Sequence, residues 1–510
     1  MKFFRIISSF TFLSLLFIIS CQYKKEASQQ SGEELAKVHC ASCHLFPEPE
    51  LLDKDTWEKN VLPEMAVQSG FQIVGGAVYP DIQQEKQGDS SYLVSKAVMS
   101  VEDWGKIVAY YAEKAPQKIA PQNRPSVTEI SALFDVSARQ VQKNGFPATS
   151  YLKIDEGNQQ LYEASYFDSS LNVFDKNLKP VSSRKLKATI VDIDFREDLK
   201  KPGTRSGFLT SIGLMHPNDL KKGKLLDFNA TAQSKALIDS LQRPVQSIAV
   251  DLDNDGYKDQ LICSFGNTKG VLAWYKNMQG KGYTKKVIRE LPGAIKAYIT
   301  DENKDGLPDI WVLFAQAQEG IFLLMNKGNG EFDTKEILRF PSVYGSSYFE
   351  LIDLNKDGYK DILYVNGDNA DLTRHLMKNY HGVYAYLNNG KNQFRQAFFF
   401  PINGCYKAIA RDFDKDGDID IATISYFPDK KNQPQEGFVY LESQGKFNFK
   451  PYTIKEVNAG KWLTMDAGDI DGDGDDDLII GNLDWNKQYN PELARKDTAF
   501  LLLKNRTIKP

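Results

Sequence analysis

The acidic pattern of the nonapeptide DLDNDGYKD (residues 251–259) recurs four more times in the C-terminal half of the chain, beginning at Asp301, Asp353, Asp412 and Asp469. Every copy has Asp or Asn at positions 1, 3 and 5, Gly at position 6 and Asp at position 9. One five-position pattern repeated at similar intervals indicates an internal repeat, because unrelated acidic turns would have no reason to share it.

The acidic pattern resembles the start of an EF-hand calcium loop, which also requires a Glu at position 12 and a helix on each side. Neither requirement is met, because the segments around each copy are β-prone and position 12 is never a carboxylate. The residues at position 12 are Ile262, Val312, Tyr364, Thr423 and Ile480. We therefore predict calcium-binding turns between pairs of strands, in which Gly at position 6 permits the sharp reversal.

The predicted calcium ligands are the side chains at positions 1, 3, 5 and 9 of each copy, with a backbone carbonyl from position 7. They are Asp251, Asp253, Asp255 and Asp259; Asp301, Asn303, Asp305 and Asp309; Asp353, Asn355, Asp357 and Asp361; Asp412, Asp414, Asp416 and Asp420; and Asp469, Asp471, Asp473 and Asp477.

The repeat resembles the FG-GAP or VCBS repeat of integrin-type β-propellers over residues 248–490. Each copy continues with a third apolar segment, such as GVLAWYKN (270–277), and a fourth, such as TKKVIREL (284–291). Four strands make one propeller blade. Two blades without the motif are expected upstream, within residues 150–175 and 188–228. Together they predict an all-β, seven-bladed propeller over residues 128–510.

Closure of the predicted ring poses a problem at the C-terminus. The last motif blade has three expected strands, near residues 463–467, 478–482 and 498–504, and little chain remains for a fourth. The edges of the first and last blades have to be covered. We predict that a segment between residues 128 and 142, such as SALFDVS (131–137), supplies the missing outer strand.

A second motif, KVHCASCHLF (37–46), lies near the N-terminus and contains Cys40, Cys43 and His44 in a C-x-x-C-H arrangement. This is the pattern of covalent c-type haem attachment, in which two thioethers hold the porphyrin and the adjacent imidazole binds the iron. If the two cysteines were half of a zinc site, two more Cys or His ligands would be needed nearby, and the next histidine in the sequence is His216. A thioredoxin-like dithiol has no need of the histidine. The haem interpretation is favoured.

Residues 31–116 resemble a small class I cytochrome c domain, which implies an all-α fold. A short helix is expected over residues 31–39, ending at the cysteine motif. A second helix is expected to begin after Ser100, a good N-cap with Asp103 three residues on, and to end at Ala115-Pro116.

The distal haem ligand is predicted to be a methionine, because thioether ligation raises the reduction potential and suits an electron carrier. Met65 follows a Trp57-containing segment in a Leu-Pro-x-Met pattern, which resembles bacterial cytochrome-like modules fused to propellers. Met99, just before the closing helix, is the alternative. Either residue could instead be a core methionine.

The first twenty residues have a basic start and a short apolar run, which predicts an export signal over residues 1–20. Ser20-Cys21 resembles a bacterial lipobox, which would make Cys21 the lipidated N-terminus; an ordinary signal with a chance cysteine is the alternative. A polar tether (21–30), the haem domain (31–116), a linker (117–127) and the propeller would follow. The expected location is the cell envelope, lipid-anchored at the outer membrane, on its periplasmic or surface face.

The overall charge and the remaining cysteines exclude other classes of protein. The formal net charge is −4 and no basic stripe is present, so nucleic acid is not an expected partner. Cys263 and Cys405 lie far apart beside apolar residues, which favours two buried free thiols over a disulfide.

The central mouth of the propeller is where a carbohydrate or other small-molecule ligand could bind. Polar residues in the connections between strands and two tryptophans are candidates. Loop and core residues whose hydrogen bonds are made within the protein would give the same pattern. They are Asn267, Asp368, Asp371, Asn482, Asp484, His216, Asp219, His375, His381, Trp462 and Trp485.

Three functions are compatible with this organisation. The favoured one is a mono-haem electron-transfer protein whose calcium-binding propeller docks a redox partner or ligand. Alternatively, the propeller is an oxidoreductase of the quinoprotein dehydrogenase kind that passes electrons to the haem, or the protein is a carbohydrate- or protein-binding adhesin. The few propeller histidines exclude a multinuclear copper cluster of the nitrous-oxide-reductase kind.

Overall fold

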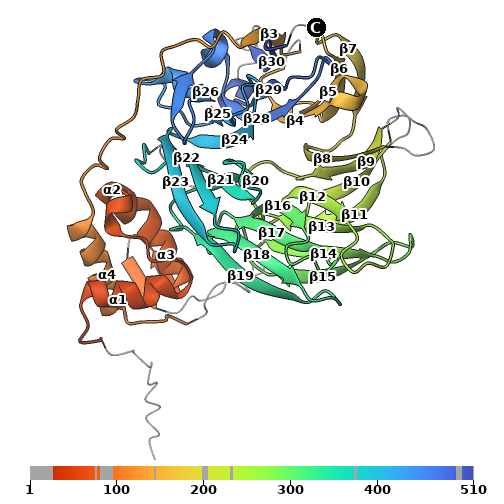
Figure 1. The fold of residues 1–510 in the computed structure, drawn as a ribbon. Helices are drawn as coiled ribbons and strands as arrows, with labels where there is room; N and C mark the ends of the chain where they lie inside the picture. The colour runs from red at the N-terminus through yellow and green to blue at the C-terminus, as the bar shows by residue number, and fades with distance from the viewer. Residues whose placement is uncertain are drawn as a thin grey trace, which may run out of the picture.

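The fold consists of a small N-terminal module beside a β-propeller (Figure 1). The computed structural model describes residues 27–74, 77–80, 96–142, 145–197, 205–229, 234–370, 372, 376–489 and 497–508. The expected export signal, Cys21, Asp371 and His375 lie outside these residues. Within the described part of the chain, no helix is long and apolar enough to cross a membrane.

Seven four-stranded antiparallel sheets form the propeller, as predicted. Blade 1 consists of β4 (Thr149–Asp155), β5 (Gln160–Ser165), β6 (Ser170–Asp175) and β7 (Pro180–Lys185). Blade 2 consists of β8 (Ile190–Glu197), β9 (Arg205–Ser211), β10 (Gly223–Asn229) and β11 (Ala236–Leu241). Blade 3 consists of β12 (Pro244–Val250), β13 (Asp259–Ser264), β14 (Val271–Asn277) and β15 (Tyr283–Arg289). Blade 4 consists of β16 (Ala294–Thr300), β17 (Asp309–Phe314), β18 (Gly320–Asn326) and β19 (Phe332–Arg339). Blade 5 consists of β20 (Ser346–Ile352), β21 (Asp361–Asn366), β22 (Gly382–Asn388) and β23 (Phe394–Pro401). Blade 6 consists of β24 (Cys405–Arg411), β25 (Asp420–Ser425), β26 (Phe438–Ser443) and β27 (Phe449–Tyr452). Blade 7 is β28 (Trp462–Gly468), β29 (Asp477–Asn482), β30 (Thr498–Asn505) and β3 (Phe134–Gln140).

The core of the propeller lies between adjacent blades. The second strands of the five motif blades are buried at every residue, because each is covered on both faces by neighbouring blades. The outer strand β7, in contrast, is almost entirely exposed. Cys263 and Cys405 are buried free thiols in different blades, as predicted.

The ring closes through a strand from the opposite end of the propeller sequence. β3 pairs antiparallel with β30, with Phe134 opposite Asn505 and Val136 opposite Leu503. The ring of Phe134 packs edge-on against that of Tyr440, with 5.5 Å between the ring centroids. The predicted closing segment is therefore confirmed, since β3 contains most of SALFDVS.

The N-terminal module contains α1 (Gly32–His39), α2 (Lys54–Thr56), α3 (Leu62–Gln68) and α4 (Val101–Lys114). The 3₁₀ turns η1 (Cys40–Ser42) and η2 (Pro49–Leu51) and the π-helical segment η3 (Trp57–Val61) join them. A two-stranded sheet, β1 (Phe71–Val74) with β2 (Ala77–Pro80), is also present, so the all-α expectation was wrong here. The β-prone residues on either side of Gly75-Gly76 explain the hairpin.

The two main helices form where they were expected, and Ser100 is the N-cap of α4, as predicted. Ser31 and Glu34 form a capping box at α1, and the Ser100 hydroxyl accepts the Asp103 N–H at α4. Gly32 packs so tightly against α4 that an added Cβ would lie 2.1 Å from the Lys106 carbonyl oxygen. The cysteine motif therefore follows a helix whose position is fixed by α4.

The module docks on one face of the propeller, where second strands connect to third strands and fourth strands to the next blade. Leu376 belongs to the apolar core of the module, and Val343 packs against that core. The Tyr380 hydroxyl donates to the Leu51 carbonyl oxygen at 3.1 Å. The acidic loops join first to second strands, so they lie on the opposite face.

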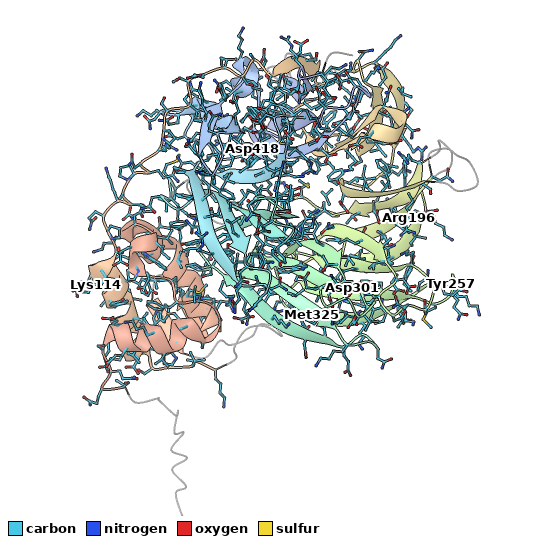
Figure 2. All side chains as sticks on the ribbon, in the orientation of Figure 1. Lys114, Arg196, Tyr257, Asp301, Met325 and Asp418 are labelled. Atoms are coloured by element: carbon cyan, nitrogen blue, oxygen red, sulfur yellow. The ribbon has the colours of Figure 1, made fainter. Side chains whose placement is uncertain are left out.

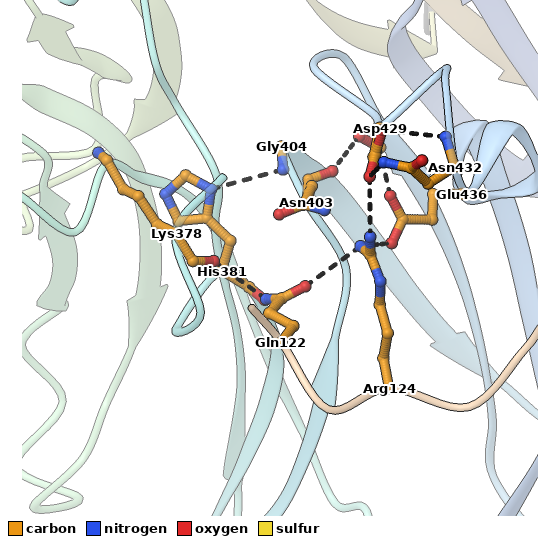
Figure 3. Close-up of polar contacts among 10 residues, drawn as sticks. Gln122, Arg124, Lys378, His381, Asn403, Gly404, Asp429, Asn432 and Glu436 are labelled. Carbon is orange, nitrogen blue, oxygen red and sulfur yellow. Dashed lines mark hydrogen bonds and ion pairs between the residues drawn. The ribbon is translucent and has the colours of Figure 1, made fainter. Parts of the chain in front are cut away.

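The segment between the two parts also lies against the propeller (Figure 3). Gln122 donates to the carbonyl oxygens of Lys378 and His381 at 3.1 and 2.7 Å. Arg124 forms ion pairs with Glu436 and, at 3.3 Å, with Asp429. These contacts hold the linker across blades 5 and 6.

Candidate functional site

The two cysteines of the C-x-x-C-H motif lie on the turn that directly follows α1. Cys40 begins the 3₁₀ turn η1, and Cys43 caps its end. Residues three apart eclipse in a 3₁₀ turn, so both thiols lie on one side of it. Both are free, with Cys40 half-buried and Cys43 exposed. The pair can therefore react with a group that approaches from this side.

The imidazole of His44 is oriented by its own neighbour in sequence. Its Nδ1 lies 3.0 Å from the Leu45 carbonyl oxygen, an arrangement that keeps the proton on Nδ1 and the lone pair on Nε2. Burial lowers the pKa of His44, and the charge of Arg339 adds to this effect. A neutral ring with its Nε2 lone pair available is the form that binds a metal.

The Cys40 thiol is not activated. Burial raises its pKa to about 11, so it remains protonated at neutral pH. The thiolate is the nucleophile in disulfide exchange, so one cysteine of a redox dithiol needs a lowered pKa. Cys40 does not supply that activated thiol.

A cavity of about 270 Å³ adjoins the motif at the boundary between the two parts of the chain. It is lined by Ala41, Ser42, Cys43, His44 and Leu45 from the module and by Gln318, Glu336 and Arg339 from blade 4. Two thiols, an oriented imidazole and an adjoining cavity fit a covalently attached haem on its proximal side.

Neither candidate distal ligand lines this cavity. Met65 lies half-buried on α3, and Met99 is 4% exposed just before α4. Both belong to the apolar cluster that also contains Cys40. The structure thus places the two methionines in one core but does not bring either of them to His44.

The five acidic loops share one backbone conformation. Position 4 has a positive φ in every loop, between 56° and 80°, and the Gly at position 6 has a φ between 85° and 100°. An added Cβ at Gly256, Gly306, Gly358 or Gly417 would meet no atom within 4 Å, so the conformation and not the space requires glycine.

Hydrogen bonds within the loops hold the acidic side chains in place. In the first loop the Asp251 carboxylate accepts the backbone N–H groups of Asp255 and Gly256 at 3.1 and 2.8 Å. The second, third and fifth loops repeat this pair of bonds. In the fourth loop only one weak bond, 3.4 Å from the N of Gly417 to Asp412, remains.

Three loops bring their carboxylates together as a cation site requires. Oxygens within 4.8 Å of one another come from Asp251, Asp253 and Asp255; from Asp412, Asp414 and Asp416; and from Asp469, Asp471 and Asp477. In the first and fifth loops the Oδ1 atom at position 3, on Asp253 and Asp471, is buried and accepts no hydrogen bond from the described residues. Such oxygens fit calcium, which prefers carboxylate ligands.

The Asp at position 9 is buried in all five loops and also has a structural role. In the first loop Asp259 accepts the N–H of Leu252 at 3.2 Å and that of Asn277, the last residue of the third strand, at 2.7 Å. The equivalent bonds recur in every motif blade. Burial raises the pKa of Asp420 to about 6 and that of Asp477 to about 7.

A lysine from the third strand reaches the carboxylates of two loops. Lys276 on β14 pairs with Asp253 and, at 3.0 Å, with Asp255. Lys504 on β30 lies 3.2 Å from Asp471. Figure 2 labels Met325, which holds the equivalent position facing the loop of Asp301, and Asp418 in the fourth loop. The sequence analysis missed these lysines, although each precedes the Asn that ends its third strand.

The propeller mouth is filled by the protein itself. Met215, in the connection between β9 and β10 of blade 2, packs with Tyr426 and Phe427 of blade 6 and Leu483 of blade 7. The ring of His216 from the same connection packs at a tilt of 35° against that of Trp485, with centroids 4.9 Å apart. A chain segment thus lies across the region where a ligand was expected.

Most of the other candidate residues at the mouth have structural roles. Trp462 is fully buried and donates to the Val457 carbonyl oxygen, so it cannot be a sugar platform. Asp219 accepts the N–H groups of Asn267, Thr268 and Lys269. Asn482 and His381 are buried, while Asp484 and Asp368 accept bonds within their own loops.

Comparison with known proteins supports the repeat and the fold. The FG-GAP-like repeat family matches residues 301–364 and 412–480, which contain four of the five acidic loops. The chain therefore carries FG-GAP-like repeats in a seven-bladed β-propeller. No curated protein matches the sequence.

Solved structures with a similar chain path share little sequence. The BBS1N domain, solved in complex with ARL6DN, is 9% identical with a TM-score of 0.42, over 75% of this chain and 97% of that one. A chain of a Saccharomyces cerevisiae complex containing Dbp5, Nup159 and Gle1 is 11% identical with a TM-score of 0.41, over 74% of this chain and 98% of that one. An ancestral GH74 enzyme is 11% identical with a TM-score of 0.45, over 74% of this chain and 52% of that one.

Proposed function

We propose that this protein is an exported, lipid-anchored, mono-haem c-type electron-transfer protein whose propeller docks a redox partner. The observation that carries the proposal is the arrangement of Cys40, Cys43 and His44 on one turn, beside a cavity at the boundary with the propeller. When bound there, a haem would supply a one-electron couple. The cysteines would form its thioethers, and His44 would bind the iron through Nε2.

The competing interpretations of the cysteine motif gain no support from its surroundings. The raised pKa of Cys40 disfavours a redox dithiol. Among the described residues, the close groups of three or more Cys, His, Asp or Glu side chains all lie in the acidic loops of the propeller. A zinc ion at the motif would therefore have fewer protein ligands than a structural site needs.

Covalent haem is tested by expressing the full chain together with a bacterial cytochrome c assembly system. Intact mass and the absorption spectrum should show one haem, lost in Cys43→Ala and retained in the matched control Cys263→Ala. Protein that matures without covalent haem would refute the proposal. A second redox cofactor in the purified protein would favour the dehydrogenase alternative.

Several calcium ions are proposed to brace the propeller on the face opposite the module. Support comes from the shared loop conformation and the grouped carboxylates. Ligands that bind only the folded state stabilise it by linkage, so calcium should raise the melting temperature and a chelator should lower it. Unchanged stability after chelation would contradict this role.

Lipidation of Cys21 remains a proposal from the sequence and implies attachment to a membrane by acyl chains. Metabolic labelling with a fatty-acid analogue in a bacterial host should mark the wild-type chain and not Cys21→Ser. Fractionation of the labelled cells would then test the proposed outer-membrane location.

A further inference from the structure

Two arginines meet beside the cavity of the C-x-x-C-H motif. Arg289 ends β15 and Arg339 ends β19, so they occupy equivalent positions on the outer strands of neighbouring blades. Both guanidinium groups lie over the ring of Phe322, at 4.0 and 5.7 Å from its centroid. Two like charges are thus held close together at one edge of the propeller.

The hydrogen bonds of this pair are incomplete. Arg339 Nη1 binds Glu336 at 2.9 Å, and Arg289 Nη2 donates to the amide oxygen of Gln318. Arg339 Nε and Arg289 Nη1 are both buried, and neither has an acceptor among the described residues. A buried donor left unpaired destabilises the folded protein unless a ligand accepts its hydrogen bond.

The charge at this site is also incompletely balanced. Among the residues that the structure describes, Glu336, whose side chain is 57% exposed, is the one acidic group ion-paired with the two arginines. One positive charge therefore remains, next to unused donors and an open cavity. This combination favours an anion with planar oxygens, because a guanidinium binds a carboxylate through two parallel hydrogen bonds.

The cavity connects the arginine pair with the haem motif. Arg339 and Gln318 line the same space as Cys43 and His44. In a haem attached to the cysteines, the two propionate carboxylates lie on the porphyrin edge away from the thioethers, so a propionate would meet the propeller side of the cavity, where Arg339 lies. The anion expected by the arginines and the cofactor expected by the cysteines therefore meet in one cavity.

We propose that the propeller supplies part of the haem site: Arg339, with Gln318 and Arg289 behind it, binds a haem propionate. This inference rests on the proposed haem and adds a cofactor-binding residue outside the cytochrome-like module. It makes the haem a shared group of the two parts, so its redox equilibrium depends on the propeller.

The test uses the full-length haem-loaded protein and the variant Arg339→Gln, which removes the charge but keeps a polar side chain. Without the cation near the propionate, the oxidised haem is less disfavoured. The equilibrium constant for reduction should fall about tenfold, which is 59 mV for a one-electron couple. The propionate should also titrate at higher pH, so the potential becomes pH-dependent between about pH 5 and 7.

Two controls separate this effect from a general loss of structure. Arg339→Lys keeps the charge, although it loses the paired hydrogen bonds. Its equilibrium constant for haem reduction should stay within about twofold of the wild-type value. Arg395→Gln removes a comparable charge from β23, where the side chain is exposed and does not line the cavity, and should change nothing. Melting temperature, followed by circular dichroism, checks that each variant is folded.

The outcomes distinguish the inference from the proposed function. Covalent haem in Arg339→Gln with an unchanged potential and pH profile would overturn the propionate contact and leave electron transfer standing. Absence of covalent haem from the wild-type chain would overturn both.

Discussion

The ammonium of Lys276 on β14 lies 3.0 Å from the carboxylate of Asp255, within the ligand set of the first acidic loop. The equivalent positions, one residue before the end of each third strand, differ among the motif blades. They are Lys276, Met325, Leu387, Glu442 and Lys504. The two lysines face loops with Asp at position 3, and the two neutral residues face loops with Asn there. The loops therefore differ in their uncompensated charge, and so in expected calcium affinity.

Replacing Lys276 with Met, the residue found in the second repeat, should strengthen calcium binding at the first loop. The ammonium no longer repels the ion or competes for Asp253 and Asp255, and about tenfold is expected for a partly exposed charge. Isothermal titration of chelator-treated protein measures this change. The reciprocal variant Met325→Lys should weaken one other site by a similar factor; affinities that stay the same in both variants would contradict the idea.

The fourth loop should bind calcium most tightly. Its position 3 is Asp414, no lysine faces it, and the nearby Glu442 adds a negative charge. The variant Glu442→Gln should therefore lower the highest affinity in the titration about threefold. Glu102→Gln, at an exposed site on α4 of the module, on the face opposite the acidic loops, serves as the control. The idea fails if the tightest site is unaffected by Glu442→Gln.

Ring closure should depend on the aromatic anchor of β3. Phe134 is buried against Tyr440 and Phe413, so Phe134→Ala should lower the free energy of unfolding by about 3–5 kcal/mol. Val181→Ala, on the exposed outer strand β7, should cost less than about 1 kcal/mol. Urea unfolding measures both. Equal effects of the two variants would show that β3 adds little to the ring.

The buried carboxyl of Glu319 should make stability depend on pH. Burial raises its pKa to about 8, while one oxygen accepts the Ser346 N–H and the other has no partner among the described residues. The folded state therefore holds a proton that the unfolded chain loses at lower pH, so stability falls as the pH rises toward about 8. Glu319→Gln should remove about 3 kcal/mol of this decline between about pH 5 and 8. Urea unfolding across that range measures it, and parallel profiles of wild type and variant would contradict the raised pKa.

The distal haem ligand is expected to be Met65. In the oxidised protein a weak near-infrared charge-transfer band should report sulfur on iron, and Met65→Ala should abolish it. Met99→Ala should keep the band but lower stability by about 2–5 kcal/mol, because that side chain is almost fully buried. The reverse pattern would assign the ligand to Met99.

The repeated loops and the blade count could be predicted because their determinants are local in sequence. The closing strand could be predicted because the last blade lacked a fourth strand of its own. Gly at position 6 and Asp at position 9 each act within one turn and its adjacent strands. The β1–β2 hairpin was missed because the cytochrome resemblance implied helices where local β-prone residues form a small sheet.

Contacts between elements that are distant in sequence explain the remaining differences. The lysines reach the loops from the third strand, and Arg339 reaches the cysteine motif from another part of the chain. The expected mouth was assigned from polar residues alone, whereas Met215 crosses to blades 6 and 7 through packing that no periodicity reveals.

The pairing of β3 with β30 sets an order of events during biosynthesis. The chain is made from its N-terminus, so β3 leaves the ribosome with an unpaired edge and waits until β30 (Thr498–Asn505) has been synthesised. Such long-range pairing is slow to form. The cysteine motif emerges earlier still, so attachment of the proposed haem would precede folding of the neighbouring propeller. Arg339 would then be the last residue to reach the proposed cofactor, when the propeller docks on the module.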